Sequence, residues 1–332
     1  MDPVEEPPRR NPIDVVADRI DGFQRRVPPL AVAHGVLKKY GEDRGGHLAT
    51  LLAYRGFFSL FPLLLAFVNA LGLLLQNDPA LRQRVIDSTL SNLPVVGPQL
   101  ADTAQPLSGS VVVLVGSILA ALWLGLGLLD VLQESLNTMW QVPMFDRPPY
   151  LLRRLRDVPA AVLVALCAVL SGGGTFVLGK DAAGVWSVVV SAAFSVSAGM
   201  LASLGLHRLL CARRVPVRAQ LPGAVAVGLG WWGLQAAGAW YVNRIVTGSS
   251  DTYGVFVVVF GLLSWSYLLA QVYLYGTELA VVLHDRRWPR SSSGRNLTDV
   301  DRAALAAAME REARVRGTEI SVSIPLTPGS TS

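Results

Sequence analysis

The sequence predicts an all-α membrane protein with six transmembrane helices and with both ends of the chain in the cytoplasm. Three observations predict this fold class. Hydrophobic residues make up 52% of the chain and charged residues only 16%, whereas soluble domains carry about 25% charge. Residues 48–75 form one apolar run that is long enough to cross a bilayer core of roughly 30 Å. Basic residues concentrate in every second connection between apolar runs.

The segment before the first apolar run, residues 1–47, is expected to be cytoplasmic or interfacial. Residues 1–12 combine proline with charge, so we expect them to be disordered. Apolar residues at helical spacing then predict two short basic amphipathic helices, over residues 13–27 and 30–40. These helices either lie on the membrane surface or pack on the protein's own cytoplasmic loops. No cleavable signal peptide is expected, because this segment is too charged and the first apolar run too long.

Residues 48–284 are predicted to form the transmembrane domain. Its six predicted spans are Leu48–Leu75, Gly109–Val131, Val158–Leu178, Gly184–Leu210, Leu221–Val246 and Tyr253–Leu283. Between the first two spans the chain is polar and rich in proline, with one short amphipathic helix predicted near residues 81–93. The helical pattern of the second span continues to a stop at Pro143.

The placement of arginine predicts the orientation of these spans. The second-to-third connection holds four arginines, four more (Arg208, Arg213, Arg214 and Arg218) lie at or beside the fourth-to-fifth connection, and the start of the tail adds Arg286, Arg287, Arg290 and Arg295. The segment before the first span is also basic. The three intervening connections hold one or two basic residues each. This alternation is what the positive-inside rule requires when an even number of spans leaves both termini in the cytoplasm.

The last segment, residues 285–332, is predicted to be a cytoplasmic tail. Thr298 and Asp301 have the spacing of a capping box, which predicts that a helix rich in alanine and charge begins there and continues to about Arg316. The final dozen residues, rich in Ser, Thr and Pro, are expected to be disordered.

Several classes of function find no support in the sequence. The net charge of +5 is what cytoplasmic arginines produce in a membrane protein, so no nucleic-acid partner is expected. Cys167 and Cys211 lie in or beside apolar runs without partner spacing, which argues against a disulfide or zinc framework. There is no Walker loop, GxSxG elbow or HExxH motif, so we expect no cofactor and no enzymatic activity. A hydrolytic nuclease needs a cluster of metal ligands, and the loops offer none.

Arg55 is the ionisable residue in the first apolar run. It lies seven residues after Leu48, roughly 10 Å into the span at 1.5 Å per residue. A charge inside the membrane is costly, so such a residue is a candidate for function. The alternative is an arginine whose head reaches back to the cytoplasmic interface.

Acidic and amide side chains are predicted at a similar depth on two other spans. Asp130, Glu134 and Asn137 share one face at the end of the second span, at spacings of four and seven. Gln271 and Glu278 share a face near the end of the sixth. We therefore expect Arg55 to pair with Glu278 or Asp130 and these groups to line the inner mouth of a polar cavity. An ion pair that only locks helices together is the alternative.

Proline and glycine add two further expectations. Pro62 lies in the middle of the first span and is expected to kink it, either to open a cavity or to accommodate packing. The glycines of the fifth span are expected to allow close helix approach rather than to form a hinge.

Three stretches resemble the YihY/BrkB family of bacterial inner-membrane proteins, formerly labelled ribonuclease BN. They are LAYRGFFSLFPLLL in the first span, LLDVLQESLNTMWQVP at 128–143 and YGVFVVVFGLLSWSYLLAQVYLYGTELAVVL at 253–283. Val257 and Thr277 depart from the family pattern, which often has glycine and alanine there. Six family-motif positions are our candidate functional residues: Arg55, Pro62, Asn137, Tyr253, Gly254 and Glu278.

The resemblance implies a six-span envelope protein. Family members are associated with envelope integrity, serum resistance and suspected transport of lipids or lipopolysaccharide precursors, and the ribonuclease label is regarded as misapplied. We therefore expect membrane lipids as partners, an anionic lipid or lipid-linked compound as cargo, and Arg55 to meet its phosphate. A scaffold for envelope partner proteins and a small-solute pore remain alternatives. A homo-oligomer is equally compatible with the sequence.

Overall fold

The computed structural model describes residues 22, 27–74, 111–178, 185–245, 254–292 and 297–318. Within these residues all regular structure is helical, which confirms the predicted all-α class. The elements are α2 (Pro28–Glu42), α3 (Gly45–Leu74), α6 (Val111–Met139), the 3-10 helix η1 (Met144–Asp146), α7 (Tyr150–Leu178), α8 (Val185–Leu210), α9 (Val217–Ile245), α10 (Gly254–His284) and α11 (Asp299–Arg311). The predictions for residues 1–21, for the short helix near 81–93, for Tyr253 and for residues 319–332 fall outside the described ranges.

Six of the helices have 26 to 31 residues. Four of them contain stretches long and apolar enough to cross a membrane: Gly45–Phe67, Val111–Met139, Val185–Leu210 and Val259–His284. The other two, α7 and α9, are equally long but carry arginines in their first turns. The protein is therefore a helical membrane protein with at least four candidate spans, while the count of six and the orientation stay predictions.

The helix boundaries differ from the predicted spans where charge occurs within a helix. α7 begins at Tyr150, eight residues before the predicted start at Val158. Its first two turns hold Arg153, Arg154 and Arg156, which the sequence placed in a loop because they are charged. The helix then continues through Pro159, whose missing N–H leaves the carbonyl one turn earlier without its usual donor.

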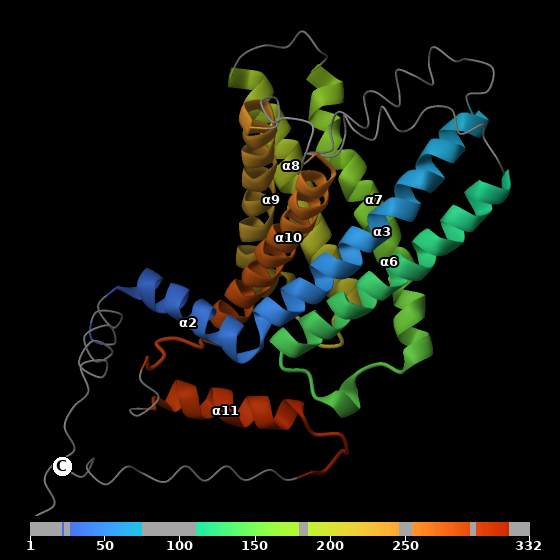
Figure 1. Ribbon diagram of the computed structural model, residues 1–332. Coiled ribbons are helices and arrows are strands. Elements are labelled where there is room, and N and C mark those ends of the chain that lie inside the picture. Colours follow the sequence, from blue (N-terminus) through green and yellow to red (C-terminus); the bar gives the residue numbers. More distant parts are fainter. Residues whose placement is uncertain are drawn as a thin grey trace, which may run out of the picture.

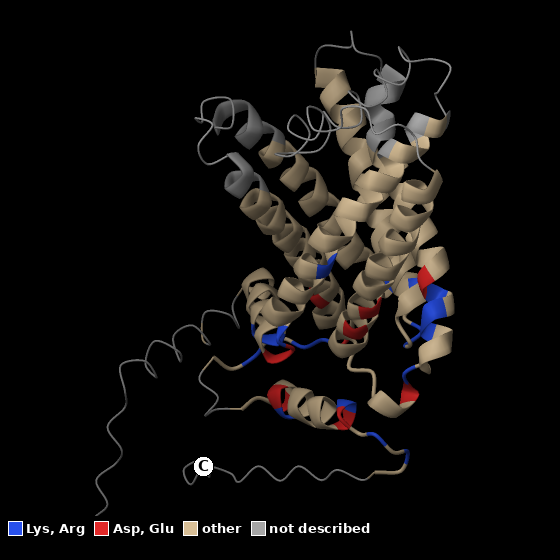
Figure 2. Ribbon diagram, turned by 45° about the vertical axis from the view of Figure 1, so that its right-hand side comes forward, with Lys and Arg blue, Asp and Glu red and all other residues tan. Residues whose placement is uncertain are grey.

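Two groups of long helices make up the molecule. α3 and α6 pack side by side, and α7, α8, α9 and α10 pack each on the next. α10 also contacts α3 and so joins the two groups. The α3–α6 pair is close to the other long helices at the end near α11 and diverges from them toward the opposite end (Figures 1 and 2).

Charged side chains gather at one end of the helices, which we call the charged end (Figure 2). α2 and α11 both lie there (Figure 1). Of the two settings predicted for the second amphipathic helix, the structure shows packing on the protein itself. α2 buries Ala31, Gly35, Val36, Lys39 and Tyr40, and Gly35 lies against the Arg287 carbonyl oxygen just after α10.

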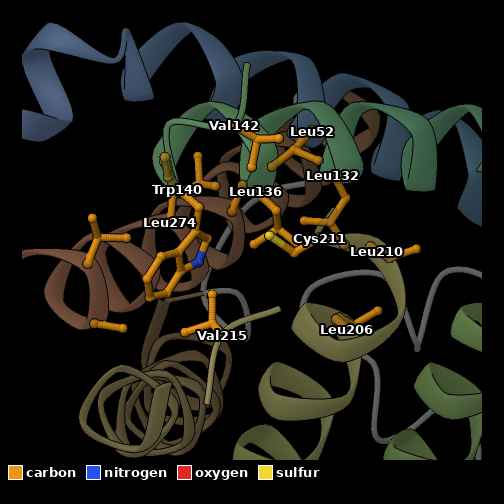
Figure 3. Packing of buried hydrophobic residues seen from close by; sticks show 14 of the residues in the cluster. Leu52, Leu132, Leu136, Trp140, Val142, Leu206, Leu210, Cys211, Val215 and Leu274 are labelled. Carbon is orange, nitrogen blue, oxygen red and sulfur yellow. The ribbon is translucent and has the colours of Figure 1, made fainter. Parts of the chain in front are cut away.

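The main hydrophobic core also lies toward the charged end. Leu136 of α6, Trp140 directly after α6, Leu210 of α8 and Leu274 of α10 are fully buried and meet there (Figure 3). Toward the other end many large apolar side chains stay exposed, such as Val112 and Trp123 of α6. Lipid tails are as apolar as these side chains, so such faces need no cover from protein within a bilayer.

Four of the five glycines of α9 allow close packing, as predicted, whereas a Cβ on Gly233 would meet nothing within 4 Å. A Cβ on Gly223 would overlap the Gly276 carbonyl oxygen of α10, and one on Gly199 of α8 would lie 2.8 Å from the Cα of Gly228. α3, by contrast, is assigned as one unbroken helix through Pro62, so the expected kink stays a prediction.

Candidate functional site

Glu278 lies in a buried ionic cluster at the charged end. Its side chain is fully buried, and its Oε2 lies 2.8 Å from the Nζ of Lys39 in α2. Lys39, 1% exposed, also donates to the Met139 carbonyl oxygen at 2.8 Å and to the carboxylate of Asp43. The lysine thus ties the end of α2 to α10 and α6.

Asp43 extends this cluster to the tail. Its Oδ1 accepts from Gln141 Nε2 and from Arg311 Nη1, both at 2.8 Å. We call Lys39, Asp43, Glu278 and Arg311 the inner cluster. Its two cations and two anions cancel, which is the condition under which buried charges are tolerated.

A second neutral group, the tail cluster, consists of Lys38, Glu42, Arg290 and Asp301. Asp301 Oδ1 lies 2.8 Å from Lys38 Nζ and 2.7 Å from Arg290 Nε. Arg290 Nη2 lies 2.7 Å from Glu42. Burial by itself raises the pKa of Asp301, but hydrogen bonds from Lys38, the Ser291 amide, Arg290 and Thr298 outweigh it, so the pKa falls below its usual value.

The capping box at the start of α11 is confirmed, and it is part of the tail cluster. Thr298 accepts from the Asp301 amide, and the Asp301 carboxylate accepts from the Thr298 amide. The same carboxylate therefore starts α11 and binds it to α2. The helix ends at Arg311, five residues before the predicted end, where the arginine side chain reaches Asp43.

The predicted pairing of Arg55 with Glu278 or Asp130 is wrong. Glu278 faces Lys39, and Asp130 pairs with Arg153 of α7. The prediction chose partners for Arg55 by their depth along the spans. It left Lys39 out as a possible partner of Glu278, because Lys39 lies in an amphipathic helix outside the spans. α2 instead folds against α10, so a lysine from outside the spans reaches the buried acid first.

The polar side chains at the end of α6 contact different partners instead of forming one site. Glu134 pairs with Arg147. Asn137, 3% exposed, accepts from the Ala212 amide at 2.8 Å through its Oδ1 and so fixes the chain after α8. Asp130, Glu134 and Asn137 each bind a different neighbouring segment, and none of them contacts Arg55.

The remaining candidates lie apart from one another. Gln271 is next to the hydroxyl of Tyr40, a tyrosine that stacks on Tyr275 with ring centroids 4.1 Å apart. Burial, with Tyr275, raises the pKa of Tyr40 to about 12. Gly254 is the first residue of α10. A cavity of about 380 Å³ is lined by residues at the end of α10 and by α11, among them Asp285, Arg286 and Asp299, and by none of the predicted site residues.

Arg55 lies on an exposed face of α3. Its neighbours on that face are apolar or aromatic: Leu51, Tyr54 and Phe58 are 39%, 57% and 41% exposed. The guanidinium reaches over to α6, where a Cβ on Gly127 would overlap its Nη1. Among the described residues it has no ion-pair partner, since the acids predicted for it are taken by Lys39 and Arg153.

The sequence reasoning missed Lys39, Asp43, Arg290, Asp301 and Arg311 as residues of the buried clusters. The signals were present, because Lys38-Lys39 stood in an amphipathic pattern and Asp301 in a capping box. Neither signal says which surface the charges face, and that depends on how α2 and α11 fold against α10.

Comparison with known proteins adds a family to this geometry. The family model described as virulence factor BrkB matches residues 36–300, which include α3 through α10 and the residues of the inner cluster other than Arg311. The chain belongs to the BrkB family. BrkB-family sequences similar to it include the ribonuclease-like protein YfkH of Bacillus subtilis, 24% identical over 265 residues that cover 76% of this chain and 94% of YfkH.

A second relative is the inner membrane protein YhjD of Escherichia coli. It is 25% identical over 169 residues, which cover 48% of this chain and 50% of YhjD. No solved structure matches the chain. The resemblance to the BrkB family seen in the three motif stretches is thus confirmed. Among the described residues no three His, Cys, Asp or Glu side chains are grouped so that they could hold a metal ion.

Proposed function

We propose that this BrkB-family protein resides in a bacterial inner membrane and helps to move or place a lipid or lipid-linked envelope component. Its relative YhjD is named an inner membrane protein, which supports this location. The basic charge of alternate connections supports six spans, with the charged end and both termini in the cytoplasm.

One observation carries the proposal: Arg55 is a cation on an exposed apolar helix face, and the described part of the chain offers it no counter-ion. An ionised side chain in a membrane helix is costly unless something compensates it. The acids at the charged end are already neutralised by Lys39, Arg153 and Arg147. The compensating group therefore comes from the lipid phase, and an amphiphile with an anionic head and apolar tails fits both the charge and the face around it.

Lipid movement between leaflets tests this function. The purified protein is reconstituted into vesicles that carry a fluorescent phospholipid in either the inner or the outer leaflet. A membrane-impermeant quencher then measures the rate at which inner-leaflet label becomes accessible or outer-leaflet label becomes protected. We expect a faster rate than in protein-free vesicles. A rate equal to that of protein-free vesicles, whichever leaflet carries the label, would count against lipid movement.

A scaffold is the second candidate, and the two buried clusters favour it. They bind α2, α10 and α11 into one unit at the charged end, which could present a fixed surface to an envelope partner protein. Two results together would support the scaffold instead. The protein would not move lipid, and a partner would co-purify with the full chain but not with a chain that lacks α11.

No ribonuclease activity is expected of this protein, although YfkH is named ribonuclease-like. The measurement is RNA degradation by the purified protein, with and without added divalent metal, against a mock preparation.

A further inference from the structure

Within the part of the chain that the structure describes, three arginines lie around residues 126–130 of α6 against two carboxylates, and Arg55 is the one of the three that has no ion pair. Within residues 126–130 of α6, Arg154 donates to the Leu126 carbonyl oxygen at 2.7 Å and Arg153 pairs with Asp130. Arg154 also pairs with Asp157 at 3.2 Å. Three arginines thus face two carboxylates in this stretch.

Gly127 makes room for the arginine of α3. Gly127 is buried and its missing side chain leaves the space that Nη1 of Arg55 occupies. The guanidinium therefore lies at the level of Gly127, one helical turn further into the apolar part of α6 than Asp130. It has not reached back to the charged end, as a purely snorkelling arginine would.

We propose that Arg55 and Gly127 form a seat for the phosphodiester of an anionic phospholipid, with the acyl chains lying along the exposed face of α3 and α6. This deepens the proposed function and rests on it, since it names the chemical class of the lipid. A guanidinium binds phosphate through two parallel N–H donors, and one negative charge neutralises the excess. Tyr54, Phe58 and the 81%-exposed Trp123 of α6 supply the apolar surface for the chains.

Choline headgroups provide the discriminating comparison. Phosphatidylcholine carries the same phosphodiester but also a fixed cation, so its net charge is zero, whereas phosphatidylglycerol keeps a charge of minus one. The seat should therefore retain phosphatidylglycerol in preference to phosphatidylcholine with the same chains. Glycerol phosphate should not displace it, because a soluble anion buries no chain on the face.

Four variants separate charge from position. Arg55→Gln removes the charge, and Arg55→Lys keeps it but loses the two parallel donors. Gly127→Ala keeps Arg55 and forces its guanidinium to move, which a flexible side chain tolerates. Gly125→Ala is the matched control, because a Cβ there meets nothing within 4 Å.

The measurement is native mass spectrometry of the purified full chain titrated with each lipid. We expect Arg55→Gln and Gly127→Ala to retain phosphatidylglycerol roughly tenfold or more weakly than the unmodified protein. Arg55→Lys should be intermediate, and Gly125→Ala unchanged. Thermal unfolding of each variant in detergent checks that the fold is intact.

An undiminished preference for phosphatidylglycerol in Arg55→Gln overturns the seat, as does displacement by glycerol phosphate. The experiments distinguish a failure of the proposed seat from a failure of the proposed function. Lipid movement that is unaffected by Arg55→Gln leaves the function standing without the seat, whereas selective retention without any movement leaves the seat as a lipid-binding site alone.

Discussion

Lys39 is the residue on which the inner cluster depends, because it contacts both buried carboxylates and the Met139 carbonyl oxygen. Glu278 was identifiable from the sequence as an acid inside an apolar run, but its partner was not. Helical spacing fixes which side chains share one helix face. The choice between Lys39 and Arg55 as the partner of Glu278 depends instead on how α2 packs against α10, which lies far along the chain. Arg55 was identified for the same reason as Glu278, and only the fold shows that no described residue forms an ion pair with it.

At the residue scale, Lys39→Met should destabilise the protein by about 3 kcal/mol, because it leaves Glu278 buried without a cation. The double variant Lys39→Met/Glu278→Gln should be more stable than Lys39→Met alone, since Asp43 keeps Arg311 and neutrality returns. Thermal unfolding in detergent measures both. Arg302→Gln is the control, because its only ion pair among the described residues is with the exposed Asp299 at 4.0 Å. Equal losses in the single and double variants would contradict the cluster.

At the element scale, α2 and α11 behave as parts of the bundle although both lie outside the predicted spans. Their existence could be read from amphipathic spacing and from the capping box, and both are confirmed as helices. Their docking could not be predicted, because it depends on ion pairs between residues up to 268 positions apart, such as Arg311 with Asp43.

The docking of α11 should resist mild acid. The pKa of Asp301 is lower in the folded protein than in the unfolded chain, so its contribution is complete above the unfolded value of about 3.9 and is lost as the pH falls through the folded value. We expect hydrogen exchange of α11, corrected for intrinsic rates, to be equally slow at pH 7 and pH 5. Asp301→Asn should lose this protection at both pH values. A collapse of protection in the unmodified protein between pH 7 and pH 5 would contradict the assignment.

At the scale of the whole molecule, the sequence predicted the fold class and the long helices, because apolar runs of that length have few alternatives in lipid. It could not predict that α3 and α6 lean away from α7–α10 (Figure 1), since lipid-facing and helix-facing side chains are equally apolar. It placed helix ends poorly where charge occurs inside a helix, as at Arg153 of α7.

The span count and orientation can be tested by thiol labelling of single cysteines in intact cells, after Cys167 and Cys211 are replaced by serine. Cysteines placed at 147, 213 and 302 should be protected from an impermeant reagent, and those at 90, 181 and 249 should react. Labelling of both groups alike, or in the opposite sense, would contradict six spans with a cytoplasmic charged end.

The most direct test of the account is the rate of phospholipid movement in vesicles that hold either the unmodified protein or Arg55→Gln at equal density. We expect the unmodified protein to move phosphatidylglycerol faster than protein-free vesicles do, and Arg55→Gln to fall back toward the protein-free rate. If the unmodified protein and protein-free vesicles give the same rate, the protein does not move lipid, and the scaffold becomes the better account.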